Sequence, residues 1–270
     1  MLYAHHPIRD RVAGTVESIA EITAQTLYDC HKVFYAPSNM VLCVEGDVDP
    51  EQVARIAEEV LPKEKAPVPH ADFGPAEALA PEEHFRLEKM EVSAPQFLIG
   101  AKLLPGLRGG EAQRQRLIAA LSLRMLCGSS SPFFTRLYAE GTLNMDFDYE
   151  VDASAGTLTM IVGGESKTPE KVLEEFNAEI ARIVREGFDE AFFIRSKRAS
   201  LGARLRALED FDNVCVSLAM DCFDGYCTFD SYKILEEITA EDCRRFAETE
   251  LAPERLALSV IAPKSGEAKA

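Results

Sequence analysis

Apolar residues recur at helical spacing in the long stretches of this chain and alternate with polar residues in the short ones. Helical spacing predicts helices over residues 111–127, 132–140, 172–184, 189–208, 210–222 and 239–250. Alternation and short apolar runs predict strands over residues 84–91 and 95–104, a hairpin of 144–152 with 158–162, and a last strand over 255–262. This order predicts an α+β unit in which helices cover at least one face of a sheet.

The first quarter of the chain has a simpler pattern. Residues 23–35 have the spacing of a helix, with Thr23 as a candidate N-cap. The run 39–45, NMVLCVE, is apolar enough to predict a buried strand. A second helix is expected after Asp49 and Pro50, because Asp is a good N-cap and Pro fits the first helical position.

Prolines concentrate between these two regions. Five of them occur in the segment 62–81, at positions 62, 67, 69, 75 and 81. Such a density favours an extended linker over a helix or strand. We therefore expect a first region of residues 1–66, a linker of residues 67–81 and a second region of residues 82–270.

A partial internal repeat connects the two regions. Residues 22–44, ITAQTLYDCHKVFYAPSNMVLCV, align without a gap with residues 238–260, ITAEDCRRFAETELAPERLALSV. Both copies begin Ile-Thr-Ala, contain Ala-Pro and end in an apolar run. Self-similarity at a fixed spacing indicates one structural unit used twice. Enough residues precede the second copy to form a whole unit, whereas only 21 residues precede the first copy. The first unit is therefore expected to be truncated.

Charge narrows the possible partners. The formal net charge of the 270 residues is −16, with 45 acidic and 29 basic residues. Nucleic-acid binding depends on Lys and Arg, and an anionic membrane surface would repel such a chain. Neither a nucleic acid nor an anionic membrane surface is expected as a partner, and no apolar run is expected to be long enough to cross a bilayer.

The seven cysteines do not predict a disulfide framework. Their number is odd, no pair has C-x-x-C spacing, and most lie in apolar segments. Reduced, buried thiols in the cytoplasm explain this pattern better than a zinc knuckle does.

Several motifs give the chain a resemblance to a known family. They are HPIRDRVAGTVESIAEIT, FYAPSNMVLCVEGDVDPEQV and GSSSPFFTRLYAEG. Together they resemble the pitrilysin/insulinase family of zinc metallopeptidases, particularly its small bacterial members similar to mitochondrial processing peptidase. The resemblance implies tandem α/β units, each with a mixed, mainly antiparallel sheet and helices on one face. It also implies a parent protein that hydrolyses peptides inside an enclosed chamber.

The zinc site of that family is not expected in this chain. The resemblance implies zinc held by H-x-x-E-H, in which two His on one helix face bind the metal and the Glu activates a water. The histidines here are at positions 5, 6, 31, 70 and 84, and no two are four apart. The family motif lies ahead of the HPIRD segment, so zinc is expected only in a full-length parent.

A helper pair of the family is also absent. Many members place an Arg, and seven residues later a Tyr, where they assist the substrate carbonyl. The resemblance puts Tyr138 and Met145 at these two places, and Arg136 is out of register. Tyr138 is expected to line the substrate chamber without a catalytic role.

An acidic row is the remaining candidate for function. Asp146, Asp148, Glu150 and Asp152 alternate with apolar residues and are expected on one face of the strand 144–152. A solvated sheet face accounts for such a row. The alternative comes from the resemblance, because a chamber lined by these carboxylates would favour cationic peptides.

Two functions from different classes follow. The first is the non-catalytic C-terminal part of a zinc peptidase, which supplies chamber wall and pairing surface. Its expected partners are peptides and either a same-family subunit or the missing N-terminal unit. A lone strand in the first region would leave its edges unpaired, which also predicts self-association, as a dimer. The alternative is a structural or docking subunit of the same family, as the core proteins of a respiratory complex are.

Overall fold

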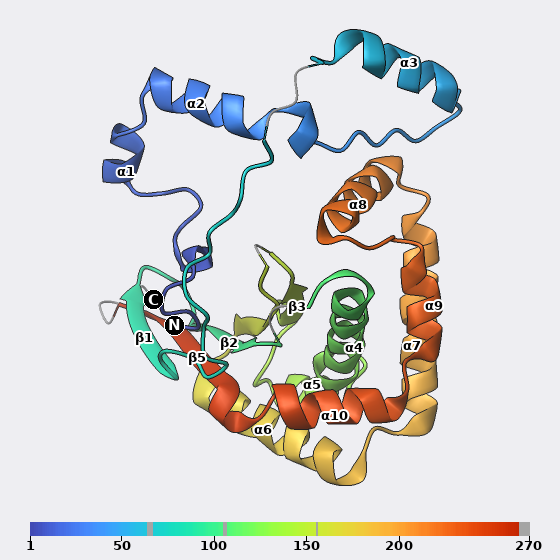
Figure 1. Cartoon of the computed structure of the whole chain (residues 1–270). Helices are drawn as coiled ribbons and strands as arrows, with labels where there is room; N and C mark the ends of the chain where they lie inside the picture. The colour runs from blue at the N-terminus through green and yellow to red at the C-terminus, as the bar shows by residue number, and fades with distance from the viewer. Residues whose placement is uncertain (64–66, 105–106, 155, 265–270) are drawn as a thin grey trace.

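An extended arm and a helix-covered sheet make up the molecule. The computed structural model describes residues 1–63, 67–104, 107–154 and 156–264. Residues 11–63, here called the arm, contain α1 (Val16–Ala20), α2 (Ala24–Phe34) and α3 (Pro50–Val60) and curve away from the rest of the chain (Figure 1). Residues 67–81 contain no helix or strand, as the proline pattern predicted.

Five strands form a single sheet in the rest of the described chain. They are β1 (Phe85–Met90), β2 (Gln96–Lys102), β3 (Asp148–Asp152), β4 (Thr159–Glu165) and β5 (Leu256–Pro263). Their order is β1-β5-β2-β4-β3, with β1 parallel to β5 and every other pair antiparallel. The expected α+β unit with a mixed, mainly antiparallel sheet is confirmed.

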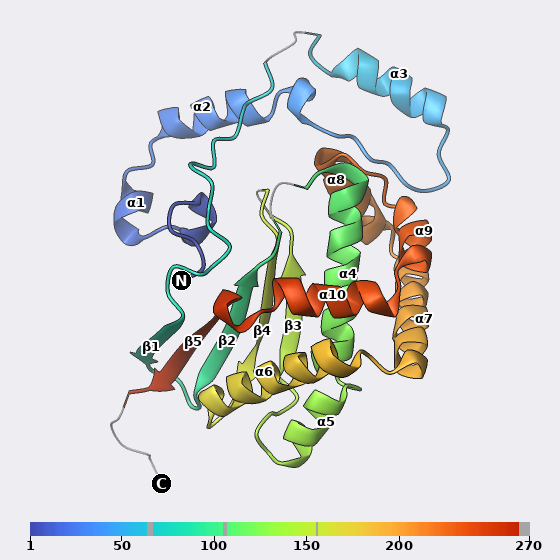
Figure 2. The ribbon, with the colours of Figure 1, turned by 60° about the horizontal axis from the view of Figure 1, so that its bottom comes forward.

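Helices cover one face of this sheet. The elements between and after the strands are α4 (Gly109–Cys127), α5 (Pro132–Ala139), α6 (Pro169–Glu186), α7 (Glu190–Ala207), α8 (Phe211–Asp224), α9 (Asp230–Glu237) and α10 (Ala240–Glu250). Helices α4, α6 and α10 pass over the same side of the strands (Figure 2). Alternate strand residues such as Ile99, Met160 and Leu258 point to these helices and are buried. The opposite face is here called the open face, and the helices α4 to α10 do not cover it.

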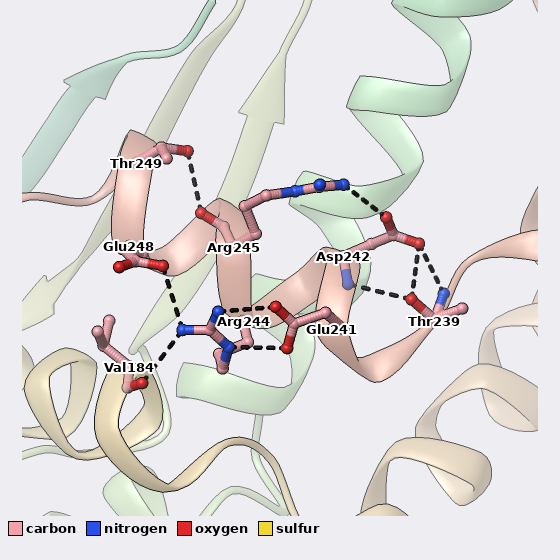
Figure 3. A network of polar contacts seen from close by, with 8 residues as sticks. All are labelled: Val184, Thr239, Glu241, Asp242, Arg244, Arg245, Glu248 and Thr249. Carbon is pink, nitrogen blue, oxygen red and sulfur yellow. Dashed lines mark hydrogen bonds and ion pairs between the residues drawn. The ribbon is translucent and has the colours of Figure 1, made fainter.

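Helix α10 is bonded to both of its neighbours. Thr239 and Asp242 form a capping box at its start, and Asp242 also accepts a hydrogen bond from Arg114 of α4 at 3.0 Å. Arg244 donates to the carbonyl oxygen of Val184 in α6 at 3.2 Å and pairs with two glutamates of its own helix, Glu241 and Glu248 (Figure 3). These bonds fix α10 across the sheet.

The repeat in the sequence is also a repeat in local structure. Thr23 and Thr239 each close a capping box at the start of a helix, α2 and α10 respectively. In both copies the Ala-Pro step then forms a short 3-10 helix, Pro37–Asn39 and Pro253–Arg255. The same residues at the same spacing thus form the same succession of elements.

The strand that should follow differs between the copies. Residues 256–263 form β5, whereas the predicted buried strand at 39–45 is wrong: this segment has no strand, and Leu42 is 65% exposed. β5 lies between β1 and β2, which bond to both of its edges. No strand among the described residues pairs with 39–45, so its peptide groups have no ladder to join.

The hairpin is shorter than its alternation predicted. Residues 144–147 form a turn, in which the amide of Asp146 donates to Oδ1 of Asn144 at 3.0 Å, and β3 starts at Asp148. Met145 is 71% exposed as a result, whereas Phe147, Tyr149 and Val151 still face the core.

One apolar stretch is longer than expected. Residues Gly109–Ala139, which span α4 and α5, are long and apolar enough to cross a membrane by length and composition. The expectation that no apolar run has this length is therefore corrected. In the structure, 72% of the most apolar window of this stretch is buried inside the fold, as in a core helix of a soluble protein.

Candidate functional site

The edge strand β3 carries the predicted acidic row on the open face. Asp148 and Glu150 are exposed and Asp152 is half-buried, and they alternate with Tyr149 and Val151, which pack against the core. Strand alternation therefore places three of the four predicted carboxylates on one face, as expected.

Small and apolar residues adjoin these carboxylates on the neighbouring strands. Glu150 is opposite Ile161 in β4, and Ile161 is opposite Gly100 in β2. Asp148 is opposite Gly163. A larger residue would not fit at position 163, because an added Cβ atom would lie 2.7 Å from the carbonyl oxygen of Phe97. The open face thus has small and apolar residues on β2 and β4 and negatively charged residues along its edge strand β3.

The fourth carboxylate is displaced from the row. Asp146 lies in the turn before β3, and its side chain accepts a hydrogen bond from Asn144 at 3.2 Å. It lines a cleft of about 380 Å³ together with Leu98, Glu165 and Ser259. The prediction that Asp146 belongs to the strand is wrong, because the turn ends the alternation before Phe147.

Tyr138 lies on a different element. It is an exposed residue of α5, and its ring stacks on Phe134 at 5.5 Å between centroids. In the described part of the chain no hydrogen bond or ring contact joins Tyr138 to the carboxylates of β3. The structure thus does not bring Tyr138 together with the acidic row.

The first ten residues, here called the strap, cover part of the open face. Leu2 packs over Gly100 so closely that a Cβ atom added at position 100 would lie 3.1 Å from Cδ1 of Leu2. The Tyr3 hydroxyl lies 2.8 Å from Oγ1 of Thr159, and the Tyr3 ring lies 5.1 Å from Nζ of Lys102. Lys102 is consequently only 4% exposed although it belongs to the open face.

Glu77 fastens the strap to the rest of the chain. Its carboxylate accepts the backbone N–H groups of Ala4, His5 and His6 at 3.1, 2.6 and 2.8 Å, and Nζ of Lys102 lies 3.8 Å away. Burial alone would raise the pKa of Glu77, but the three N–H donors and Lys102 outweigh it and lower the pKa to about 2. Burial lowers the pKa of Lys102, an effect that Glu77 and Glu82 only partly oppose.

We expect the strap to detach in acid. Because the pKa of Glu77 is lower in the folded chain than in the unfolded chain, the bonds are fully present above about pH 4.5 and are lost as the pH falls through about 2. Amide chemical shifts of Ala4, His5 and His6, followed by NMR, should titrate with a midpoint near 2. The variant Glu77→Gln should show detached-strap shifts already at neutral pH; unchanged shifts would contradict the assignment.

The histidines of the strap, His5 and His6, do not form a zinc site with the other described residues. Nδ1 of His6 accepts a hydrogen bond from the backbone N–H of Ile8 at 3.1 Å, and its ring stacks on Phe73. Within the described residues no three side chains of His, Cys, Asp or Glu are grouped as a metal site requires. The residues present do not fit zinc, and no zinc-dependent step is assigned to them.

The sequence did not indicate the strap contacts. Glu77 lies in the segment interpreted as a linker, and Tyr3 and Lys102 lie far from it in the sequence. No periodicity connects these residues, because the contacts form only when the N-terminus crosses the sheet.

Comparisons with known proteins concern the family and the fold. The family described as peptidase M16 inactive domain matches residues 21–200. The uncharacterized zinc protease YmfH of Bacillus subtilis is 32% identical over 268 residues, which are 98% of this chain and 62% of YmfH. The chain thus spans less than two thirds of this relative.

Solved structures share the fold. An M16-like peptidase from Alicyclobacillus acidocaldarius superposes with a TM-score of 0.89 at 27% identity, over 97% of this chain and 63% of the peptidase. A chain of complex III2 from Candida albicans superposes with a TM-score of 0.78 at 13% identity, over 96% of this chain and 64% of that chain. At 13% identity the second match shows the fold alone.

Proposed function

Because this chain belongs to the family of peptidase M16 inactive domains, we propose that it is the non-catalytic part of a zinc peptidase that cleaves peptides in an enclosed chamber. Its roles are to pair with the zinc-bearing part and to supply chamber wall. The observation that carries the proposal is the arm, which leaves nearly all of its apolar side chains exposed.

The exposure of the arm is extensive. Ala36 is the only residue of the arm that is buried, and Leu27 is 61% exposed. Other exposed apolar residues of the arm include Tyr28, Phe34, Leu42 and Val44. A soluble chain rarely exposes so much contiguous apolar surface unless another surface covers it.

The covering partner we propose is the zinc-bearing part of the parent protein. YmfH is longer than the part that this chain matches, so a relative of this chain has the additional sequence that such a unit needs. In its absence a second copy of the chain covers the same surface, which produces self-association. All seven cysteines are free thiols, but only Cys127 and Cys243 are buried, so the expectation of buried thiols is wrong for the other five. Free thiols fit a cytoplasmic location for this assembly.

The open face supplies the peptide-binding wall. It carries the β3 carboxylates beside a strip of small and apolar residues, within a chain of net charge −16. An extended peptide with Lys and Arg side chains complements both features. The strap covers only one part of this face.

Neutralising the row should weaken the binding of basic peptides. Since exposed ion pairs each contribute about 0.2–1 kcal/mol, Asp148→Asn combined with Glu150→Gln should cost up to about 2 kcal/mol. Fluorescence anisotropy of a labelled Lys-rich peptide measures the change. The control, Glu236→Gln combined with Glu237→Gln on the outer helix α9, removes the same net charge and should have little effect. Equal losses of peptide affinity in the two double variants would contradict the proposal that the open face binds peptides.

The proposal that this chain is the non-catalytic part is tested by comparing it with the full-length parent protein. Loaded with zinc, the parent should cleave an unfolded peptide, and this chain alone should leave the same peptide intact under the same conditions. Cleavage by the chain alone, abolished by a chelator, would overturn the proposal.

A structural or docking subunit is the second candidate. The shared fold with a chain of complex III2 from Candida albicans favours it. Zinc analysis of the full-length parent separates the two candidates, because stoichiometric zinc requires a peptidase-type site and its absence indicates a scaffold.

A further inference from the structure

The strap divides the open face into a covered half and an uncovered half. On β2, Leu98 is exposed, whereas Gly100 and Lys102, which follow on the same face, are buried. Leu2 and Tyr3 of the strap lie over these two buried residues. The change from exposed to buried along one face of a single strand therefore marks where the strap begins to cover the sheet.

The covered half adjoins the acidic row. Asp152 is opposite Thr159 in the sheet, and Oγ1 of Thr159 lies 2.8 Å from the Tyr3 hydroxyl. Glu150 is on the same face of β3, two residues before Asp152. A peptide that followed the open face towards these carboxylates would therefore meet Tyr3.

The strap does not fill the space above the covered half. A cavity of about 450 Å³ remains between Leu2, Ile8 and Arg9 of the strap and Asp152 and Ile161 of the sheet. Protein interiors leave few voids larger than a water molecule, so the strap fits its site less closely than a core element would. Since Arg9 and Asp152 line the same cavity, the strap itself presents a cation to the acidic row.

Polar bonds at a few points hold the strap in place. Besides the bonds to Glu77, the carbonyl oxygen of Met1 accepts the backbone N–H groups of Glu82 and Glu83 at 2.9 and 3.2 Å. The strap contains no strand, and its regular structure is the short 3-10 helix Pro7–Arg9. Hydrogen bonds of this kind contribute modestly to net stability, so another ligand can replace them.

We propose that the strap is an internal competitor for the open face, which a basic peptide displaces before it reaches the carboxylates of β3. The inference rests on the proposed function of this face as a peptide-binding wall. The attached strap covers the half of the face beside Asp152, and the detached strap leaves that half free for the peptide. The apparent affinity for the peptide is then reduced in proportion to the fraction of chains whose strap is detached.

The affinity of Glu77→Gln for a labelled Lys-rich peptide, measured by fluorescence anisotropy, tests the inference. The variant removes a negative charge and leaves Lys102 without the carboxylate that pairs with it, so electrostatics alone would weaken the binding of a basic peptide. A competing strap predicts the opposite sign, at least about threefold tighter binding, because detachment uncovers the face. Glu237→Gln on the outer helix α9 removes the same charge and should bind no more tightly than the unmodified chain.

A second variant separates detachment from charge. Leu2→Ala combined with Tyr3→Ala removes the contacts of the strap with the sheet and leaves the net charge of the chain unchanged. This variant should also bind the peptide at least about threefold more tightly than the unmodified chain. Thermal melting confirms that each variant is folded.

The possible outcomes separate this inference from the proposed function. If the peptide binds the unmodified chain and both strap variants equally well, the open face remains a peptide-binding wall and the competition is refuted. If no form of the chain binds the peptide, the wall and the competition both fail. Amide NMR signals of His5 and His6 that stay unchanged while the peptide saturates the unmodified chain would also refute the competition.

Discussion

Replacing Glu250 by Gln is expected to lower the free energy of unfolding by about 3–5 kcal/mol, because it leaves a buried cation unpaired. Glu250 is 2% exposed, and its Oε2 atom lies 2.9 Å from the guanidinium of Arg255. The same oxygen accepts the backbone N–H of Leu104, and Arg255 also donates to the carbonyl oxygens of Lys102 and Thr249. The pair therefore joins the end of α10, the end of β2 and the start of β5.

Urea unfolding of the variant and of a control on the same helix measures this effect. Glu248 lies two residues away, is half exposed and, among the residues that the structure describes, forms an ion pair only with Arg244, so Glu248→Gln should cost about 0–1 kcal/mol. The account requires a lower unfolding midpoint for Glu250→Gln with little change in slope. Similar midpoints for the two variants would show that the buried pair does not stabilise this junction.

Truncating Phe147 to Ala should cost a comparable amount, about 3–5 kcal/mol. The Phe147 ring lies 6.4, 6.1 and 5.7 Å, between centroids, from the rings of Phe97, Phe133 and Phe134. It therefore packs the start of β3 against β2 and α5. Removing it leaves a cavity in a cluster whose other members are fixed by helix and strand.

Met145 provides the matched control. The alternation of the sequence places Met145 and Phe147 on the same face, but Met145 is exposed in the turn. Met145→Ala should change the free energy of unfolding by no more than about 0.5 kcal/mol. If calorimetric unfolding showed equal losses for Met145→Ala and Phe147→Ala, the strand would extend over both residues, as the alternation suggested.

Local signals in the sequence predicted most of the elements. Thr23, Asp49 and Thr239 cap the helices that they were expected to begin, because capping depends on a few neighbouring atoms. The motifs that resemble the pitrilysin/insulinase family led to the family that the comparisons confirm. Short-range chemistry and sequence similarity were therefore sufficient for the fold class.

Features that depend on distant partners could not be predicted in this way. The segment 39–45 has the composition of a buried strand, but a strand requires neighbouring strands that the described chain does not provide for it. The turn at Asn144 moved Asp146 out of the acidic row because one side-chain hydrogen bond outweighed the alternation. The partners of Glu77 come from segments far apart in the sequence, and no local pattern marks them.

Sedimentation equilibrium of the purified chain tests the central claim, that the arm is a pairing surface, most directly. The account predicts a mass above the 29.8 kDa of a single chain that rises with concentration. Substituting two exposed apolar residues of the arm, Leu27→Glu and Leu42→Glu, should return the mass toward 29.8 kDa without unfolding the sheet. A mass of 29.8 kDa for the unmodified chain at every concentration would contradict the account.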